Sequence, residues 1–181
     1  MNKTILVASL LALAGMSSVA AAADDNWFIR GELGSGKLHV NDLGSTDSDT
    51  AGQIAGGYYF NPNFAVEGFY ENYGKHGDGV GDSVEMDGWG LGVVAKKDFG
   101  PNNTGFFIDG RLGLAFNNMK FTAAGLGSAS DNSTKAYFGV GLGYDFNRNF
   151  GLSLNYDYTS ASAFGVSGHA NTWTGGLEVR F

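Results

Sequence analysis

The side chains in this sequence that could perform chemistry are mainly acidic. Asp and Glu together number 18, Lys and Arg number 11, His numbers three, and Cys is absent. The lack of Cys excludes disulfides, thiolate metal sites and cysteine nucleophiles. The net charge of −7, with scattered basic residues, argues against a nucleic-acid partner, because phosphate binding needs clustered Lys and Arg. A binding or catalytic site would therefore consist of carboxylates, imidazoles and hydroxyls.

One short segment brings imidazole and carboxylate groups together. His76 is followed by Asp78 and Asp82, and carboxylates of this kind can bind a divalent cation. The stretch from Asp78 to Asp82 lacks the spacing of a defined calcium loop, however. The alternative interpretation is that acidic loops simply keep the surface soluble, and we expect no cofactor and no dedicated metal site.

Ser167 and His169 are a candidate nucleophile and base. In an extended strand both would lie on one face, but no carboxylate on that face stands nearby to orient the histidine. The glycine-rich stretch 139–143 is followed by no helix, so it does not form a nucleotide-binding loop. The sequence therefore favours a protein without enzymatic activity.

Alternation of bulky residues with period two predicts the elements that carry these groups. It runs from Trp27 to Phe181, and no sustained helical period competes with it. The pattern predicts eight strands. Their bulky series cover residues 27–33, 54–60, 64–70, 89–93, 106–116, 138–146, 150–158 and 173–181.

The connections between these strands alternate in length. Short ones, rich in turn-forming residues, lie at 61–63, 98–104 and 147–149, and longer ones lie at 36–49, 74–83, 117–133 and 160–170. This order predicts an up-and-down meander. The motif G-Y-x-F-N-x-N-F also occurs twice, at 57–64 and 143–150, around two of the short turns.

The two faces of the strands differ in a way that indicates their surroundings. No bulky position carries a charge, whereas the other face combines Gly and Ala with charged residues such as Arg30, Glu67 and Asp157. An eight-stranded barrel has too little room inside for the bulky face, so that face must point outward. Closed barrels are the strand structures that can span lipid, and aromatic residues here gather at both strand ends as in membrane girdles. The predicted fold is an all-β, eight-stranded, antiparallel, up-and-down transmembrane β-barrel.

Five inward-facing charges should lie near the middle of this barrel. They are Arg30, Glu32, Glu67, Asp109 and Arg111. Charged groups away from water must find partners, so we expect a paired network that blocks the lumen. A narrow or gated pore is the alternative if the pairs exchange.

The first 23 residues have the features of a secretory signal peptide. A positive start is followed by an apolar stretch at 5–14 and by Ala21 to Ala23, small residues that suit cleavage. The alternative is an uncleaved membrane anchor. We expect a signal peptide at 1–23 and one barrel domain at 24–181.

The chain resembles the small eight-stranded outer-membrane barrels of Gram-negative bacteria, similar to the transmembrane domain of outer membrane protein A and to opacity proteins. Three segments carry the resemblance, Gly139 to Phe146, Leu152 to Tyr158 and Gly175 to Phe181. The terminal Phe181 resembles the family's signal for the barrel-insertion machinery. No residue follows it, so we expect no peptidoglycan-binding domain of the kind that some relatives append.

The resemblance implies a location in the bacterial outer membrane, with short turns in the periplasm and long loops outside. It implies a non-enzymatic barrel, expected to be a monomer, that contributes to envelope integrity and presents acidic loops. Outer-membrane lipids, lipopolysaccharide with its cation layer, and the insertion machinery would be its partners. A lipid A-modifying enzyme is the alternative, although Ser167-x-His169 reverses the His-x-Ser order of lipid A deacylases.

Overall fold

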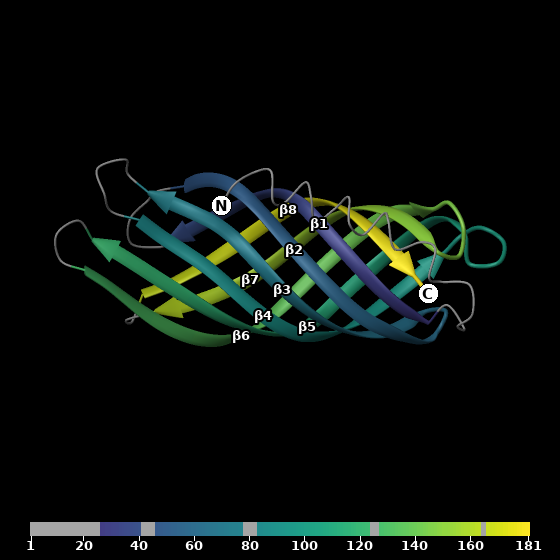
Figure 1. The fold of residues 1–181 in the computed structure, drawn as a ribbon, viewed down its shortest axis with the longest axis horizontal. Coiled ribbons are helices and arrows are strands. Elements are labelled where there is room, and N and C mark those ends of the chain that lie inside the picture. The colour runs from purple at the N-terminus through teal and green to yellow at the C-terminus, as the bar shows by residue number, and fades with distance from the viewer. Residues whose placement is uncertain (1–25, 41–45, 78–82, 124–126, 164–165) are drawn as a thin grey trace.

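The computed structural model describes residues 26–40, 46–77, 83–123, 127–163 and 166–181. Each strand pairs antiparallel with its neighbours in the sequence, and the first also pairs with the last, which closes the barrel (Figure 1). Among these residues no helix is long and apolar enough to cross a membrane. The predicted architecture is confirmed. The strands are β1 (Trp27–Val40), β2 (Thr46–Asn61), β3 (Phe64–Gly77), β4 (Ser83–Asp98), β5 (Gly105–Ala123), β6 (Gly127–Asp145), β7 (Phe150–Ala163) and β8 (Val166–Arg180).

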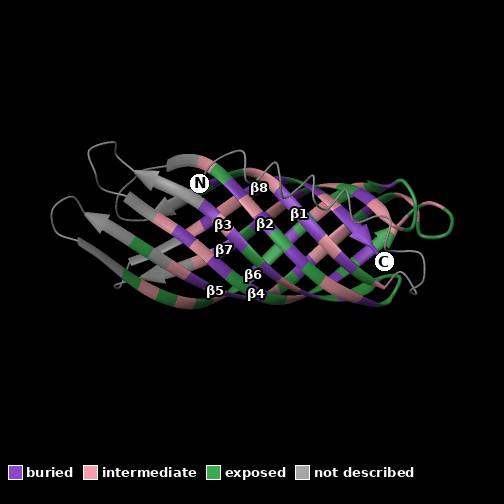
Figure 2. Ribbon diagram, in the orientation of Figure 1, coloured by how far each residue is buried: buried purple, intermediate pink, exposed green. Residues whose placement is uncertain are grey.

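The wall of the barrel separates bulky apolar residues outside from polar residues inside, as predicted. Leu91, Leu112 and Leu142 are each 58% exposed, and buried and exposed positions alternate along the strands (Figure 2). Most of the inward charges are buried, among them Arg111 at 1%, and Asp109 is half-buried. Val179 departs from the outward series because it is only 3% exposed, beside its register partners in β1 and β7.

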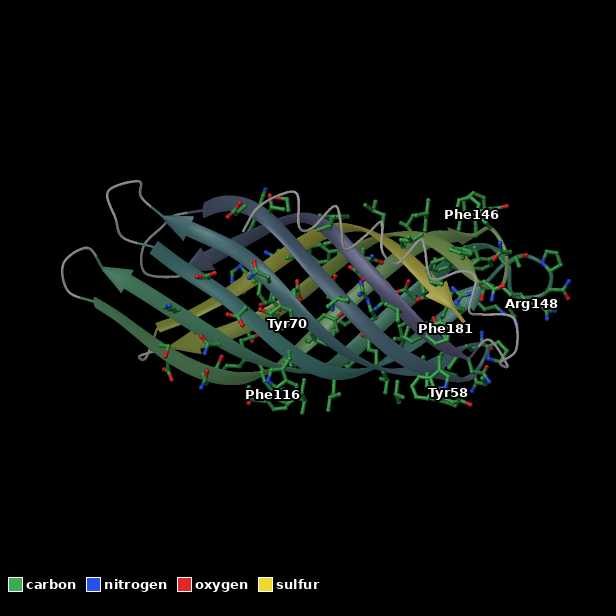
Figure 3. All side chains as sticks on the ribbon, in the orientation of Figure 1. Tyr58, Tyr70, Phe116, Phe146, Arg148 and Phe181 are labelled. Carbon is green, nitrogen blue, oxygen red and sulfur yellow. The ribbon has the colours of Figure 1, made fainter. Side chains whose placement is uncertain are left out.

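Aromatic side chains form a girdle at each end of the strands. Tyr58, Phe146 and Phe181 project near the short turns, whereas Tyr70 and Phe116 project toward the other end (Figure 3). Their rings pack in cross-strand pairs. Examples are Trp27 with Tyr58, Phe106 with Tyr144, Trp89 with Phe116 and Tyr156 with Trp173, with ring centroids 5.1, 5.0, 4.3 and 5.0 Å apart. Two such girdles are characteristic of a barrel that crosses a membrane.

The two copies of the repeated motif fold into the same turn. In the first, the Oδ1 atom of Asn61 accepts hydrogen bonds from the backbone N–H groups of Asn63 and Phe64, at 2.8 and 2.9 Å. Asn147 makes the equivalent bonds at 2.8 and 2.9 Å in the second copy. The repeat is therefore a turn in which an asparagine side chain substitutes for a backbone acceptor.

The four longer connections differ from the sequence prediction. Strands continue far into the segments expected to be loops, so that β5 runs to Ala123 and β6 begins at Gly127. The physical reason is that hydrogen bonding between strand backbones does not require apolar side chains outside the lipid. The bulky alternation therefore ends at the membrane boundary, while the hairpins extend beyond it.

We call the end of the barrel that carries the four extended hairpins the long-hairpin end. Toward it the ring of strands separates into two halves. In the described part of the chain, pairing of β2 with β3 stops at Gly52↔Asn72 and pairing of β6 with β7 stops at Tyr137↔Thr159, whereas the other strand pairs continue. One half consists of β3 to β6 and the other of β7, β8, β1 and β2. Their facing side chains are buried. They include Tyr73, Met86 and Asn117 from the first half and Ala51, Ala170 and Thr172 from the second.

Large aromatic side chains also point into the barrel, which the sequence analysis missed. Each of three buried phenylalanines lies beside a glycine of the next strand. The pairs are Phe28 with Gly57, Phe69 with Gly90 and Phe107 with Gly143. A Cβ atom on any of these glycines would press against the ring beside it. The inward glycines therefore make room for rings that fill the narrow interior.

Gly90→Ala should destabilise the barrel by about 1–3 kcal/mol, the usual cost of overpacking a filled interior. The new methyl group would meet the ring of Phe69 and, at 2.6 Å, the carbonyl oxygen of Leu114. Phe69 cannot easily withdraw, because its ring packs against Tyr137 with centroids 4.7 Å apart. Denaturant unfolding in lipid vesicles measures the difference. Gly110→Ala is the control, since nothing lies within 4 Å of a Cβ there, and an equal loss in both variants would contradict the packing role.

Candidate functional site

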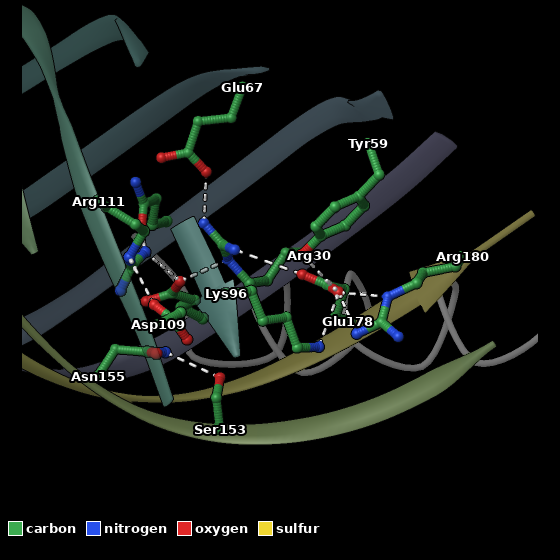
Figure 4. Close-up of polar contacts among 12 residues, drawn as sticks. Arg30, Tyr59, Glu67, Lys96, Asp109, Arg111, Ser153, Asn155, Glu178 and Arg180 are labelled. Carbon is green, nitrogen blue, oxygen red and sulfur yellow. Dashed lines mark hydrogen bonds and ion pairs between the residues drawn. The ribbon is translucent and has the colours of Figure 1, made fainter. Parts of the chain in front are cut away.

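The structure brings the five charges predicted for the lumen into one connected network. Arg30 and Glu32 come from β1, Glu67 from β3, and Asp109 and Arg111 from β5. Period-two alternation places all five on the inner face of the wall. Figure 4 shows the side chains of Arg30, Glu67, Asp109 and Arg111 converging inside the barrel.

Arg30 is the first centre of this network. Its Nε donates to Glu32 at 2.8 Å and its Nη2 donates to Glu67 at 2.6 Å. A longer contact of 3.4 Å joins its Nη1 to Glu178 of β8. The side chain of Arg30 is 5% exposed, so one buried guanidinium joins carboxylates from three strands.

Arg111 is the second centre, and it shares a carboxylate with the first. Its Nη1 donates to Oε1 of Glu32 at 2.8 Å, the oxygen that also accepts from Arg30. Its Nη2 lies 3.2 Å from Asp157, and its Nε lies 3.7 Å from Asp109. Because Glu32 joins the two guanidinium groups, the paired charges form one unit across the lumen.

Hydroxyl groups complete the coordination of these carboxylates. Thr174 donates to the second oxygen of Glu32 at 2.6 Å, and Tyr137 donates to Asp157 at 3.0 Å. A buried ion pair is stable only when its remaining hydrogen-bonding positions are also satisfied. These neutral donors do so from β8 and β6.

A second cluster lies nearer the short turns, and the sequence analysis did not include it in the network. Lys96 lies 2.6 Å from Asp145, and Arg180 lies 2.9 Å from the same carboxylate and 2.6 Å from Glu178. Glu178 connects the two clusters through Arg30. The alternation predicted that these residues face inward. The alternation could not show that the tilt of the strands brings Lys96, Asp145 and Arg180 next to the network around Arg30.

Aromatic rings line the space between the charges. The ammonium of Lys96 lies 3.8 Å from the centroid of the Phe107 ring. The guanidinium groups of Arg30 and Arg180 lie 5.6 and 5.5 Å from the rings of Phe28 and Tyr59. Cation–π contacts of this kind hold charge without leaving room for water.

Two cavities lie among the described residues at and below the short-turn end. One of about 280 Å³ opens at the short-turn end, lined by Tyr59, Lys96, Asp98, Arg148 and Arg180. The next, between Arg30, Phe107 and Glu178, has a volume of about 10 Å³. A space of that size holds roughly one water molecule. Around this second cavity the charged side chains fill the lumen, and we call this group of paired charges the plug.

Two contacts span the interior toward the long-hairpin end. The backbone oxygen of Tyr73 in β3 lies 3.0 Å from the position that a Cβ on Gly36 of β1 would occupy. Asn117 of β5 likewise reaches over β6 and donates to the carbonyl of Ser160 in β7 at 3.4 Å. These contacts join the two halves of the barrel above the plug.

The buried interior holds more carboxylates than cations. Four basic and six acidic residues are buried among the described residues, and Asp109 is a further, half-buried carboxylate. Glu67, Glu71 and Asp109 each keep one oxygen without a hydrogen-bond partner. Any leak through the plug should therefore favour cations, because the uncompensated field inside is negative.

The other candidate residues have different outcomes. Asp78, Asp82 and the side chain of His76 lie outside the described residues, as do residues 1–23 and the side chain of Ser167. Elsewhere in the described chain, no group of three or more acidic residues or histidines could hold a metal ion. The backbone of Phe181 closes the barrel by exchanging hydrogen bonds of 2.9 and 3.1 Å with Trp27.

A closed barrel with an uncharged bulky exterior and a paired polar interior defines a transmembrane barrel of the outer-membrane class. Residues 8–181 match the family described as the outer membrane protein beta-barrel domain. The chain belongs to this family, and it is a protein of the bacterial outer membrane.

Relatives agree with this fold. An uncharacterised protein of Haemophilus influenzae is 32% identical over 102 residues, which are 55% of this chain and 54% of that protein, so the chain spans about half of its length. Neisserial surface protein A has a TM-score of 0.73 at 16% identity, covering 86% of this chain and 97% of its own. Ail of Yersinia pestis has a TM-score of 0.55 at 19% identity, covering 84% and 99%. At these identities the two structures support the fold alone.

Proposed function

We propose that this protein is a sealed, non-enzymatic outer-membrane barrel that contributes to the integrity of the envelope. The observation that carries the proposal is the buried plug, in which Arg30 and Arg111 share Glu32 across the lumen at 2.8 Å each. A plugged barrel adds a rigid, lipid-facing wall to the membrane without adding a channel.

The hairpins at the far end from the short turns are the surface that such a barrel offers to the outside. Short turns are periplasmic in this class of barrel, so the extended hairpins should be extracellular. Acidic side chains there, including Asp87 and Asp131, keep the hairpins hydrated. We propose that they mediate surface interactions, that lipopolysaccharide is the lipid neighbour, and that Phe181 contributes to recognition by the insertion machinery.

A deletion strain tests the proposed function. Loss of the gene should raise sensitivity to detergent and leave the mass profile of lipid A unchanged, and the cloned gene should restore resistance. Purified wild-type protein should also insert into planar bilayers without opening steady channels. A changed lipid A profile would instead support an enzyme, and unchanged detergent sensitivity would contradict a role in integrity.

A further inference from the structure

The outward surface of β7, β8 and β1 changes in character, row by row, toward the long hairpins. Residues in register across the three strands lie side by side on one face, because directly opposite residues of antiparallel strands point the same way. The first row is aliphatic, the second is aromatic, and the third and fourth carry Lys, amide and His residues. These rows are Leu33, Gly175 and Leu154; Ser35, Trp173 and Tyr156; Lys37, Asn171 and Tyr158; and His169 and Ser160.

Side-chain contacts hold the aromatic row and the row above it together. The rings of Tyr156 and Trp173 lie 5.0 Å apart, and the hydroxyl of Tyr156 donates to Oδ1 of Asn171 at 3.0 Å. That bond fixes the orientation of the Asn171 amide, so its Nδ2 group points away from Tyr156 and can donate to another acceptor. Tyr158 stacks on His169 with centroids 5.8 Å apart, and Trp173 is 56% exposed.

The other side of the barrel has the same aromatic row, but there a carboxylate and a lysine stand in register above it. Tyr70, Trp89 and Phe116 are in register across β3, β4 and β5. The next position on β4 is Asp87, which accepts from Tyr70 at 3.4 Å, and Glu85 follows. A general membrane girdle accounts for aromatic rows on both sides. It does not account for the difference above them, because Lys120 of β5 is in register with Glu85, whereas Lys37 is in register with Ser48 and Asn171, neither of which is acidic.

We propose that the surface formed by Lys37, Asn171, Trp173 and Tyr156 binds the phosphorylated sugar headgroup of the outer-leaflet glycolipid, lipid A. Aromatic faces can stack against sugar rings, the ammonium of Lys37 pairs with a phosphate, and the Asn171 amide donates to it. The acyl chains then continue along Leu33 and Leu154. The inference rests on the proposed extracellular position of the hairpins, and it requires nothing of the plug.

Native mass spectrometry of the purified barrel with added lipids tests the site. Wild type should retain diphosphoryl lipid A, and lose it when the phosphates are removed. Lys37→Gln should lower the retained fraction about tenfold, the effect of one lost charge-assisted hydrogen bond. Lys120→Gln on β5 removes an equal, exposed charge, in register with Glu85, and should change nothing. Equal losses in both variants, or equal retention of phosphatidylglycerol by wild type, would overturn the proposal.

Two further comparisons separate the stacking and the orientation from the charge. Trp173→Leu should weaken lipid A retention while Trp89→Leu, in the matching row of the other side, should not. The chain has no Cys, so single cysteines report their side of the membrane directly. Lys37→Cys should react with an impermeant maleimide in intact cells, and Asn63→Cys should not. The reverse labelling would refute the orientation, whereas correct labelling without lipid A retention would refute the site alone.

Discussion

Arg111→Ala should destabilise the folded barrel by about 3–5 kcal/mol, the usual cost of removing one partner from a buried ion pair. The side chain is fully buried, and its guanidinium contacts Glu32 at 2.8 Å and Asp157 at 3.2 Å. The substitution would leave both carboxylates without this cation in a space too small to admit several waters. Denaturant unfolding in lipid vesicles measures the change.

The same substitution should open a cation-selective leak. The interior already holds more carboxylates than cations, so removing Arg111 deepens the negative field and draws in water and cations. Planar-bilayer recordings should be silent for wild type and show cation current for the variant. Arg148→Ala, in an exposed short turn, loses the same charge and should behave like wild type. Steady conduction by wild type, unchanged in Arg111→Ala, would support the pore instead.

Leu154→Arg should cost about 2–4 kcal/mol and sharply reduce the folded fraction in bilayers, as Arg does at a lipid-facing midplane position. Leu154 is 48% exposed on the outer wall. Its register partners are Leu142 of β6 and Gly175 of β8, which places it in the apolar band between the girdles. A guanidinium there faces hydrocarbon with no partner. Folding yield, read from the gel shift of folded protein, measures the loss.

Leu154→Ala separates the effect of charge from that of lost volume. Alanine keeps the outer wall apolar, so it should reduce folding far less than arginine. Ser153→Ala, on the inward side of the same strand, should also be mild, although it removes the acceptor of the Asn155 amide at 3.0 Å. Equal tolerance of arginine and alanine at position 154 would refute the assignment of this face to lipid.

Most of the fold could be predicted because membrane barrels impose a simple periodicity. Each strand needs uncharged residues on its outer face and small or polar residues on its inner face. The residue type alone therefore indicates that Leu142 faces outward and Gly143 inward. The lengths of the hairpins could not be predicted in the same way. Outside the lipid, strand pairing between β5 and β6 continues to Ala123↔Gly127 through mostly polar residues. Backbone hydrogen bonds do not depend on side-chain type, so this part of the sequence shows no alternation that would reveal the strands.

Only part of the candidate site could be predicted from the sequence. The period-two alternation placed Arg30 and Arg111 on the inner face, and in the structure both pair with Glu32. The alternation does not give the height of a residue along the barrel axis, however, so Lys96 and Arg180 were not predicted to belong to the network. The alternation also gave no reason to expect the rings of Phe107 and Tyr59 inside the barrel. A large inward side chain does not fit the pattern of small and polar inward residues, and the glycine that makes room for it lies on another strand.

By itself the sequence determined which side of the wall most strand residues occupy, how many strands cross the membrane, and where two of the short turns lie. These properties depend on neighbours one to three positions away. The tertiary structure alone decided which charges meet, because Arg30 and Glu178 are 148 positions apart and touch only when β8 closes against β1 at a particular register. Closure also fixes the lumen's width, and that width determines whether the same charges line a pore or form a plug.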